Sequence, residues 1–144
     1  TLSLHDALPI YTKFFGGEIK IQNLTYLFYW VYKAPNCSTN AFFAYLDDVL
    51  RSELRQGKEF IITGDINSNL LDESLPQTQR AIEFMDVNQL SQLISKPTRI
   101  SSGSVSLIDV IITSAPQLFS KTGVLRNSLS DHFPIFGVIP LMKH

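Results

Sequence analysis

The segment at residues 59–67, with the sequence EFIITGDIN, constrains the fold of this chain more than any other stretch. Residues 60–63 are apolar or β-branched, which is typical of a strand buried on both faces. We expect Gly64 to end this strand, with Asp65 and Asn67 directly after it. Side chains two apart in extended chain point the same way, so both would lie at the carboxyl end of a core strand, where open α/β sheets bind ligands. Gly-Asp-x-Asn is also good turn chemistry, and this segment alone leaves both interpretations open.

Size and composition narrow the possibilities further. The chain has 144 residues, enough for one modest domain, and 44% of them are hydrophobic while 17% are charged. No apolar run reaches the roughly 18 residues needed to span a bilayer, so we expect no membrane partner. The net charge is −1, so a nucleic-acid partner would need local contacts in place of a basic field. Cys37 is the single cysteine, which excludes an intrachain disulfide and a cysteine-based zinc site and suits an intracellular protein.

Apolar periodicity predicts an α/β fold around residues 59–67. The aromatic and β-branched residues 25–32 predict a strand, and residues 38–40 can cap a helix that runs to about residue 55. Together with the strand at 59–64, these elements form a strand–helix–strand unit. A second helix is expected at 76–88, with Ile82, Phe84 and Met85 as its inner face. The other expected strands are 19–22, 90–94, 106–113, and one each within 117–125 and 133–141, while 96–104 is expected to be a loop.

The first ten residues fit poorly with the rest. Residues 1–10 resemble a translated sequencing-adaptor read-through, and they lack the basic start and apolar core of a secretory signal. We therefore interpret them as a non-native tail and residues 11–144 as the domain.

Polar side chains interrupt two later apolar segments. Asp109 lies within a run of leucine, isoleucine and valine, where a carboxylate is costly unless it is paired or hydrogen-bonded. His132 directly precedes another predicted strand and is the natural partner, because a carboxylate fixes the tautomer of an imidazole and stabilises its cation. An Asp109–His132 pair beside Asp65 would leave a second carboxylate within reach of an attacking water, as a hydrolase requires. Each residue alone has a structural explanation, so the prediction depends on their joint occurrence at strand ends.

The order of these motifs and the residues around them resemble those of a known superfamily. Gly-Asp-x-Asn at 64–67, Ile-Asp-x-Ile at 108–111 and Ser-Asp-His at 130–132 are similar to the endonuclease/exonuclease/phosphatase superfamily. The segments VYKAPN at 31–36, KPTRI at 96–100, SLIDVIIT at 106–113 and SDHFPIF at 130–136 resemble the endonuclease domain of LINE-type (non-LTR) retrotransposons. The resemblance runs from about residue 25 to residue 138. It implies an α/β fold, a DNase-like two-sheet β-sandwich flanked by helices.

The resemblance also implies an activity and its partners. It suggests a metal-dependent DNA endonuclease that nicks target DNA in the nucleus for retrotransposition, with a reverse transcriptase domain on the same polyprotein. The chemistry would need Mg²⁺ or Mn²⁺ to neutralise charge on the pentavalent phosphate.

Carried over by position, the resemblance assigns roles to seven residues. Asp65 would orient and deprotonate the attacking water, while Asn67 and His132 would contact the scissile phosphate. Asp109 would orient His132, and Tyr32 would reach the phosphate or the leaving oxygen. Two further roles are implied: Asp131 would lie by the metal or its water, and Thr98 would line the DNA-binding surface.

One part of the pattern is missing. The family supplies an asparagine and a metal-binding glutamate before the strand that contains Tyr32, but only Glu18 is available there, in a sequence unlike the family motif. We therefore expect the chain to hold mostly one sheet of the sandwich and the edge of the other, with an apolar inner face partly uncovered. We expect the chain alone to be inactive and weakly stable, and metal-dependent plasmid nicking abolished by Asp65→Ala would contradict this.

Two alternatives stay open at this stage. The first is a phosphomonoesterase of the same superfamily, acting on inositol phosphates or lipid headgroups. The second is a catalytically inert transposon remnant, which the missing glutamate favours and the intact Asp65, Asn67, Asp109 and His132 oppose.

Overall fold

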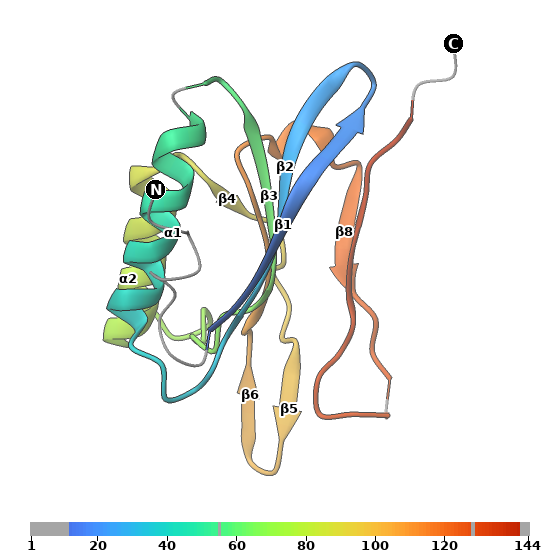
Figure 1. Ribbon diagram of the computed structural model, residues 1–144. Helices are drawn as coiled ribbons and strands as arrows, with labels where there is room; N and C mark the ends of the chain where they lie inside the picture. The colour runs from blue at the N-terminus through green and yellow to red at the C-terminus, as the bar shows by residue number, and fades with distance from the viewer. Residues whose placement is uncertain (1–11, 55, 128, 142–144) are drawn as a thin grey trace.

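The computed structural model describes residues 12–141, apart from residues 55 and 128, so the tail proposed at residues 1–10 lies outside the described residues. Figure 1 shows three layers: a pair of helices, a central sheet, and a small sheet against the opposite face. The helices are α1 (Thr39–Leu54), α2 (Pro76–Val87) and the 3₁₀ helix η2 (Pro116–Leu118). The strands are β1 (Thr12–Ile21), β2 (Leu24–Lys33), β3 (Glu59–Asp65), β4 (Ser91–Gln92), β5 (Arg99–Ser101), β6 (Ser104–Ser106), β7 (Asp109–Thr113), β8 (Lys121–Val124) and β9 (Ile135–Val138).

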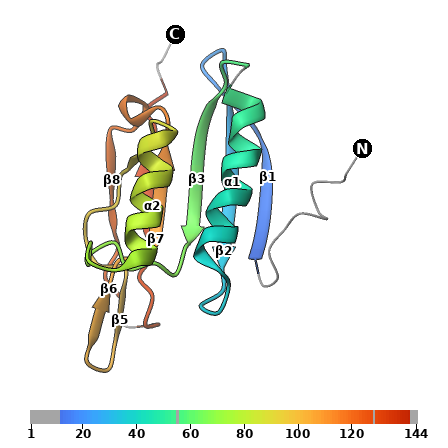
Figure 2. The same ribbon diagram turned by 90° about the vertical axis from the view of Figure 1, so that its left-hand side faces the viewer.

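The central sheet has five strands in the order β1-β2-β3-β7-β4. Strands β2 and β3 are parallel and are joined through α1, as predicted for the strand–helix–strand unit, while the other neighbours are antiparallel. The hairpins β5–β6 and β8–β9 form separate two-stranded sheets. Both helices lie side by side on one face of the central sheet (Figure 2), so its other face is left to β8 and β9. None of the helices within residues 12–141 is long and apolar enough to cross a membrane.

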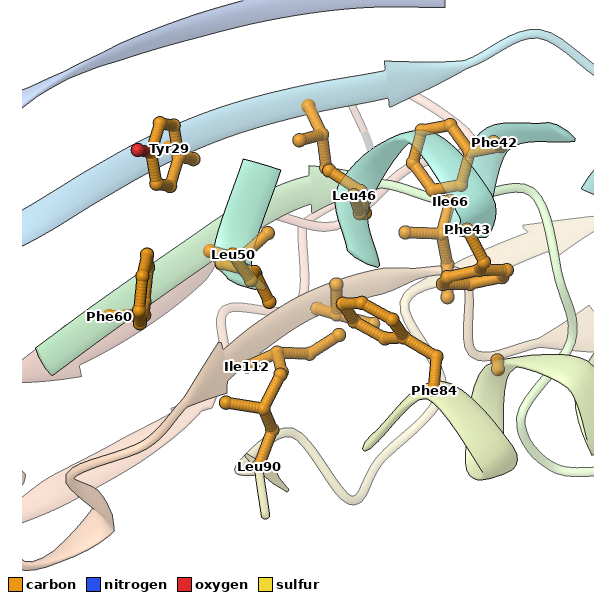
Figure 3. Packing of buried hydrophobic residues seen from close by; sticks show 14 of the residues in the cluster. Tyr29, Phe42, Phe43, Leu46, Leu50, Phe60, Ile66, Phe84, Leu90 and Ile112 are labelled. Atoms are coloured by element: carbon orange, nitrogen blue, oxygen red, sulfur yellow. The ribbon is translucent and has the colours of Figure 1, made fainter. Parts of the chain in front are cut away.

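The main core lies between the helices and the central sheet. Helix α1 begins where the Ser38 hydroxyl accepts a hydrogen bond from the Ala41 amide at 3.2 Å. Its residues Phe42, Phe43, Leu46, Val49 and Leu50 are buried in the core. Helix α2 presents Thr78, Ala81 and Phe84 as its buried residues, while Ile82 and Met85 of the predicted inner face are only half-buried. Figure 3 shows how these side chains pack: Phe42, Phe43, Leu46, Leu50, Phe60, Phe84 and Ile112.

Gly64 does not end its strand, contrary to the prediction. It lies within β3 and pairs with Val31 on one side and with Val110 on the other. Its φ is +139°, and a Cβ atom at this position would lie 1.9 Å from the Val31 carbonyl oxygen. The glycine is therefore required because the backbones of β2 and β3 approach closely here.

Three other element predictions were wrong in their extent. Strand β1 covers ten residues and pairs along the whole of β2, where only a short strand at 19–22 was expected. The stretch at 96–104, expected to be a loop, contains β5 and the start of the hairpin to β6. The strand expected at 106–113 is two strands, β6 and β7, separated at Leu107 and Ile108.

Candidate active site

Three of the predicted site residues lie in one row across the central sheet. Tyr32 of β2 is in register with Asp65 of β3, and Asp65 is in register with Asp109 of β7. Because the side chains of register partners point to the same face, all three belong to the face that carries β8 and β9. Ile61 and Ile111 of this face line an apolar cavity of about 330 Å³ together with residues of β9. The polar row therefore lies at the end of an otherwise apolar inner face.

His132 comes to this row from the connection between β8 and β9. Its Nδ1 lies 3.0 Å from Oδ2 of Asp109, and its side chain is 37% exposed against 16% for Asp109. The backbone of His132 forms a β-bridge with Arg99 at the base of the β5–β6 hairpin. The predicted Asp109–His132 contact is thus present in the structure. It joins the rim of the central sheet to the connection between β8 and β9.

Asp65 and Asn67 form a turn and belong to the site at once. The Asn67 amide donates to Oδ1 of Asp65 at 2.8 Å, and Asn67 has a left-handed φ of +45°. The Asn67 side-chain amide donates to the Lys33 carbonyl at 2.6 Å, so the turn is anchored to the end of β2. The chain therefore leaves the extended conformation after Asp65, and the two side chains do not simply share a face as predicted.

The environment of Asp65 disfavours its charged form. Burial raises the pKa of the Asp65 carboxyl, and the neighbouring Asp109 charge raises it further. The hydrogen bond from the Asn67 amide and the charges of His132 and Arg99 act in the opposite direction but do not cancel the increase. A carboxyl group held this way at a rim of the sheet is a candidate general base.

Asp65, Asp109 and His132 also form the one cluster of potential metal ligands found among the described residues. One ligand atom from each lies within 4.8 Å of those of the other two. Two adjacent carboxylates and an imidazole suit a divalent cation, which would relieve the repulsion that raises the pKa of Asp65.

Two acidic residues considered for the metal lie outside this cluster. Oδ2 of Asp131, predicted to lie by the metal, accepts from Nε of Arg99 at 3.0 Å, and this guanidinium lowers the pKa of the Asp131 carboxyl. Glu18, on β1, accepts instead from Lys58 at 3.3 Å.

Thr98 does not line a DNA-binding surface, because it is fully buried. Its hydroxyl accepts hydrogen bonds from the amides of Ile108 and Asp109, at 3.1 and 3.0 Å. Sequence reasoning missed this internal role, and it also missed Asn69, whose Oδ1 accepts from the Leu107 amide at 3.0 Å. The second asparagine of the run GDINSN was the available signal for Asn69.

The fold and the site together define a class, the endonuclease/exonuclease/phosphatase type of α/β sandwich. More particularly, the chain belongs to the endonuclease-reverse transcriptase family, whose model matches residues 26–136. No curated protein matches the chain.

Solved structures share this fold at low sequence identity. The endonuclease domain of TRAS1, a telomere-specific non-LTR retrotransposon, is 19% identical with a TM-score of 0.77, and the match covers 90% of this chain and 64% of that one. An endonuclease/exonuclease/phosphatase family protein from Leptotrichia buccalis is 20% identical with a TM-score of 0.67, covering 89% and 53%. A 3′ phosphatase from Neisseria, bound to a product DNA hairpin, is 15% identical with a TM-score of 0.63, covering 92% and 72%. The predicted fold class is confirmed, and the chain spans about two-thirds or less of the first two.

Proposed function

We propose that this chain is part of a metal-dependent phosphodiesterase domain, a DNA endonuclease that nicks target DNA in the nucleus for retrotransposition. The observation that carries the proposal is the Asp109–His132 contact at 3.0 Å, placed beside Asp65 on the same rim. A hydrolase that attacks a phosphodiester needs a base for the water and donors for the phosphate oxygens, and these residues supply both.

The proposed roles follow from the contacts. The raised pKa of Asp65 suits a carboxylate that takes a proton from water. Asp109 accepts a hydrogen bond from Nδ1–H of His132. Because Nε2 then carries a proton only in the imidazolium, we expect the imidazolium form to donate to a phosphate oxygen. Asn67 is fixed by the Lys33 carbonyl and retains one amide N–H for the phosphate, and Tyr32 stands in the same row.

A divalent cation completes the proposal. The carboxylates of Asp65 and Asp109 would hold Mg²⁺ or Mn²⁺, while His132 would stay available for the phosphate. The bound cation would supply positive charge where negative charge develops on the phosphate.

The shape of the rim favours a polymeric substrate over a small phosphate ester. The β5–β6 hairpin projects from the body of the molecule (Figure 1), and its base is bridged to His132 through Arg99. Ile100 and Val105 of this hairpin are 42% and 51% exposed. A projecting arm fixed to a catalytic segment can contact nucleotides beyond the cleaved bond. The family name and the retrotransposon neighbour support DNA as substrate and a reverse transcriptase as neighbouring domain.

Nicking of supercoiled plasmid tests the proposal. One arm expresses the chain together with the coding sequence upstream of it, and the other expresses residues 1–144 alone. We expect Mg²⁺- or Mn²⁺-dependent nicking in the first arm only, with a loss of at least about 100-fold for Asp65→Ala or His132→Ala. Asp86→Ala, which removes an exposed carboxylate from α2, is the matched control and should keep full activity.

The same preparations distinguish the alternatives. Release of phosphate from inositol phosphates or 3′-phosphorylated oligonucleotides without nicking would identify a phosphomonoesterase. Absence of both activities in the longer polypeptide would identify an inert remnant.

A further inference from the structure

Three consecutive backbone amides, two just before β7 and one at its first residue, donate hydrogen bonds to side chains. The Leu107 amide donates to Oδ1 of Asn69 at 3.0 Å, and the Ile108 and Asp109 amides donate to the hydroxyl of Thr98 at 3.1 and 3.0 Å. The acceptors thus come from two loops and not from a neighbouring strand. The segment 107–109 ends at Asp109, so the position of this segment determines where the Asp109 carboxylate lies.

Thr98 holds both members of the Asp109–His132 pair. Its hydroxyl fixes the Asp109 backbone, and its carbonyl accepts from the Phe133 amide at 2.7 Å, directly after His132. Because Thr98 has no exposed surface, water cannot replace its hydroxyl at the two amides. One buried residue therefore sets the distance between an Asp on β7 and a His on the β8–β9 connection.

Asn69 ties the same strand to the loop that follows Asp65. Besides the Leu107 amide, its Oδ1 accepts from the Leu71 amide at 3.2 Å, and its carbonyl accepts from the Thr78 hydroxyl at 2.8 Å. The Leu107 carbonyl in turn accepts from the Leu70 amide at 2.9 Å. Asn69 therefore joins the loop after Asp65, the start of β7 and the first turn of α2.

We infer that Thr98 and Asn69 are positioning residues, which set the relative placement of Asp65, Asp109 and His132 without contacting substrate. The catalytic meaning of this inference rests on the proposed nuclease function, but the placement itself can be measured without activity. A residue needed only for folding would change stability and leave the state of the His132 ring unaltered.

The test is the ring ¹⁵N spectrum of His132 at about pH 8, where an ordinary histidine is neutral. The His132 signals are assigned by their absence in His132→Gln. In the native chain and in Thr98→Ser, which keeps the hydroxyl, we expect a single tautomer with the proton on Nδ1. Thr98→Val should give a mixture of tautomers, and Asn69→Ala a smaller change of the same sign. Thr122→Val, which removes a half-buried hydroxyl bound to the Leu93 carbonyl, should keep the native spectrum.

Two results would overturn the inference: a native His132 spectrum in folded Thr98→Val, or, if that variant does not fold, a native spectrum in Asn69→Ala. In the longer polypeptide, Thr98→Val should lower the kcat for nicking about 100-fold at unchanged KM, and Thr98→Ser should restore it. If the native polypeptide does not nick at all, the proposed function fails, while the His132 spectrum still decides the positioning role.

Discussion

Asp65 is held in a place that favours its protonated form. Burial and the facing carboxylate of Asp109 both raise the pKa of its side chain. Two carboxylates in register on adjacent strands repel each other, and packing alone gives no reason to retain them. This is the kind of local conflict that functional sites keep at the expense of stability.

The pH dependence of stability follows from this raised pKa. A carboxyl with a folded pKa above its unfolded value of about 3.9 contributes stability that is complete below that pH and is lost as the pH rises through the folded pKa. We therefore expect Asp65→Asn to be more stable than the native chain at pH 7 in EDTA, with the difference vanishing near pH 3. Urea denaturation of the native chain and of Asp65→Asn, at each pH, measures this difference in the free energy of unfolding.

The control for this prediction removes one negative charge elsewhere. Asp48→Asn changes a carboxylate on α1 whose side chain is 76% exposed, and its stability should stay within about 0.5 kcal/mol of native. An Asp65→Asn chain that is no more stable than native at pH 7 would show that the carboxylate causes no strain.

Among the elements, the two helices are linked by one partly buried polar network. Asp47 of α1 accepts from Arg80 of α2 at 3.1 Å and from Asn88, just after α2, at 2.7 Å. The Arg80 guanidinium also lies over the Phe43 ring, 5.6 Å from its centre. The network therefore joins α1 to α2 next to Phe43, a buried residue of the core.

Removing the shared acceptor should loosen this contact. Asp47→Ala leaves Arg80 and Asn88 without their carboxylate, and we expect a loss of about 2 kcal/mol in the free energy of unfolding, measured in urea. Asp48→Ala is the matched control on the next helical position, because its ion pair with Arg51 is exposed and 3.9 Å long. The control should change stability by less than about 0.5 kcal/mol. Equal losses of stability in the two variants would mean that the effect comes from helix propensity and not from the polar network.

Sequence patterns predicted the strongly apolar elements and missed those set by long-range pairing. Strands β2 and β3 and both helices follow from residues that carry their own periodicity. The β5–β6 hairpin is rich in serine, so its strands exist because they pair with each other and, through Arg99, with His132. The break before β7 depends on Thr98 and Asn69, whose side chains reach amides far away in sequence.

The same limit explains the site. The grouping of Asp65, Asp109 and His132 was predictable because each lies near an end of an apolar segment, and the ends of paired strands meet at the rim of a sheet. Thr98 was misplaced because a threonine that points inward looks the same in sequence as one that points outward. The ion pair between Asp131 and Arg99 could not be predicted, because Arg99 belongs to a hairpin that the sequence pattern does not reveal.

For the molecule as a whole, the inner face of the central sheet is only partly covered. Strands β8 and β9 leave Phe15 and Trp30, which face each other on β1 and β2, 71% and 42% exposed. Exposed aromatic pairs beside an apolar cavity favour association with other apolar surfaces.

This face should make residues 1–144 bind apolar dyes and self-associate. We expect Phe15→Ser with Trp30→Thr to lower dye fluorescence by at least about half and to reduce association in sedimentation experiments. Val87→Ser removes an isolated residue of α2 that is 73% exposed, and it should change neither signal. Unchanged dye binding in the double variant would mean that the dye binds to another surface of the protein.

The row formed by Tyr32, Asp65 and Asp109 has one more consequence. Neighbouring strands keep a separation of about 5 Å, so the backbone ladder itself acts as a ruler for these three groups. Strand pairing therefore fixes the backbone spacing of these three groups, while Thr98 and Asn69 fix the start of β7. A change in the length of the projecting β5–β6 hairpin should therefore leave this backbone spacing unaltered.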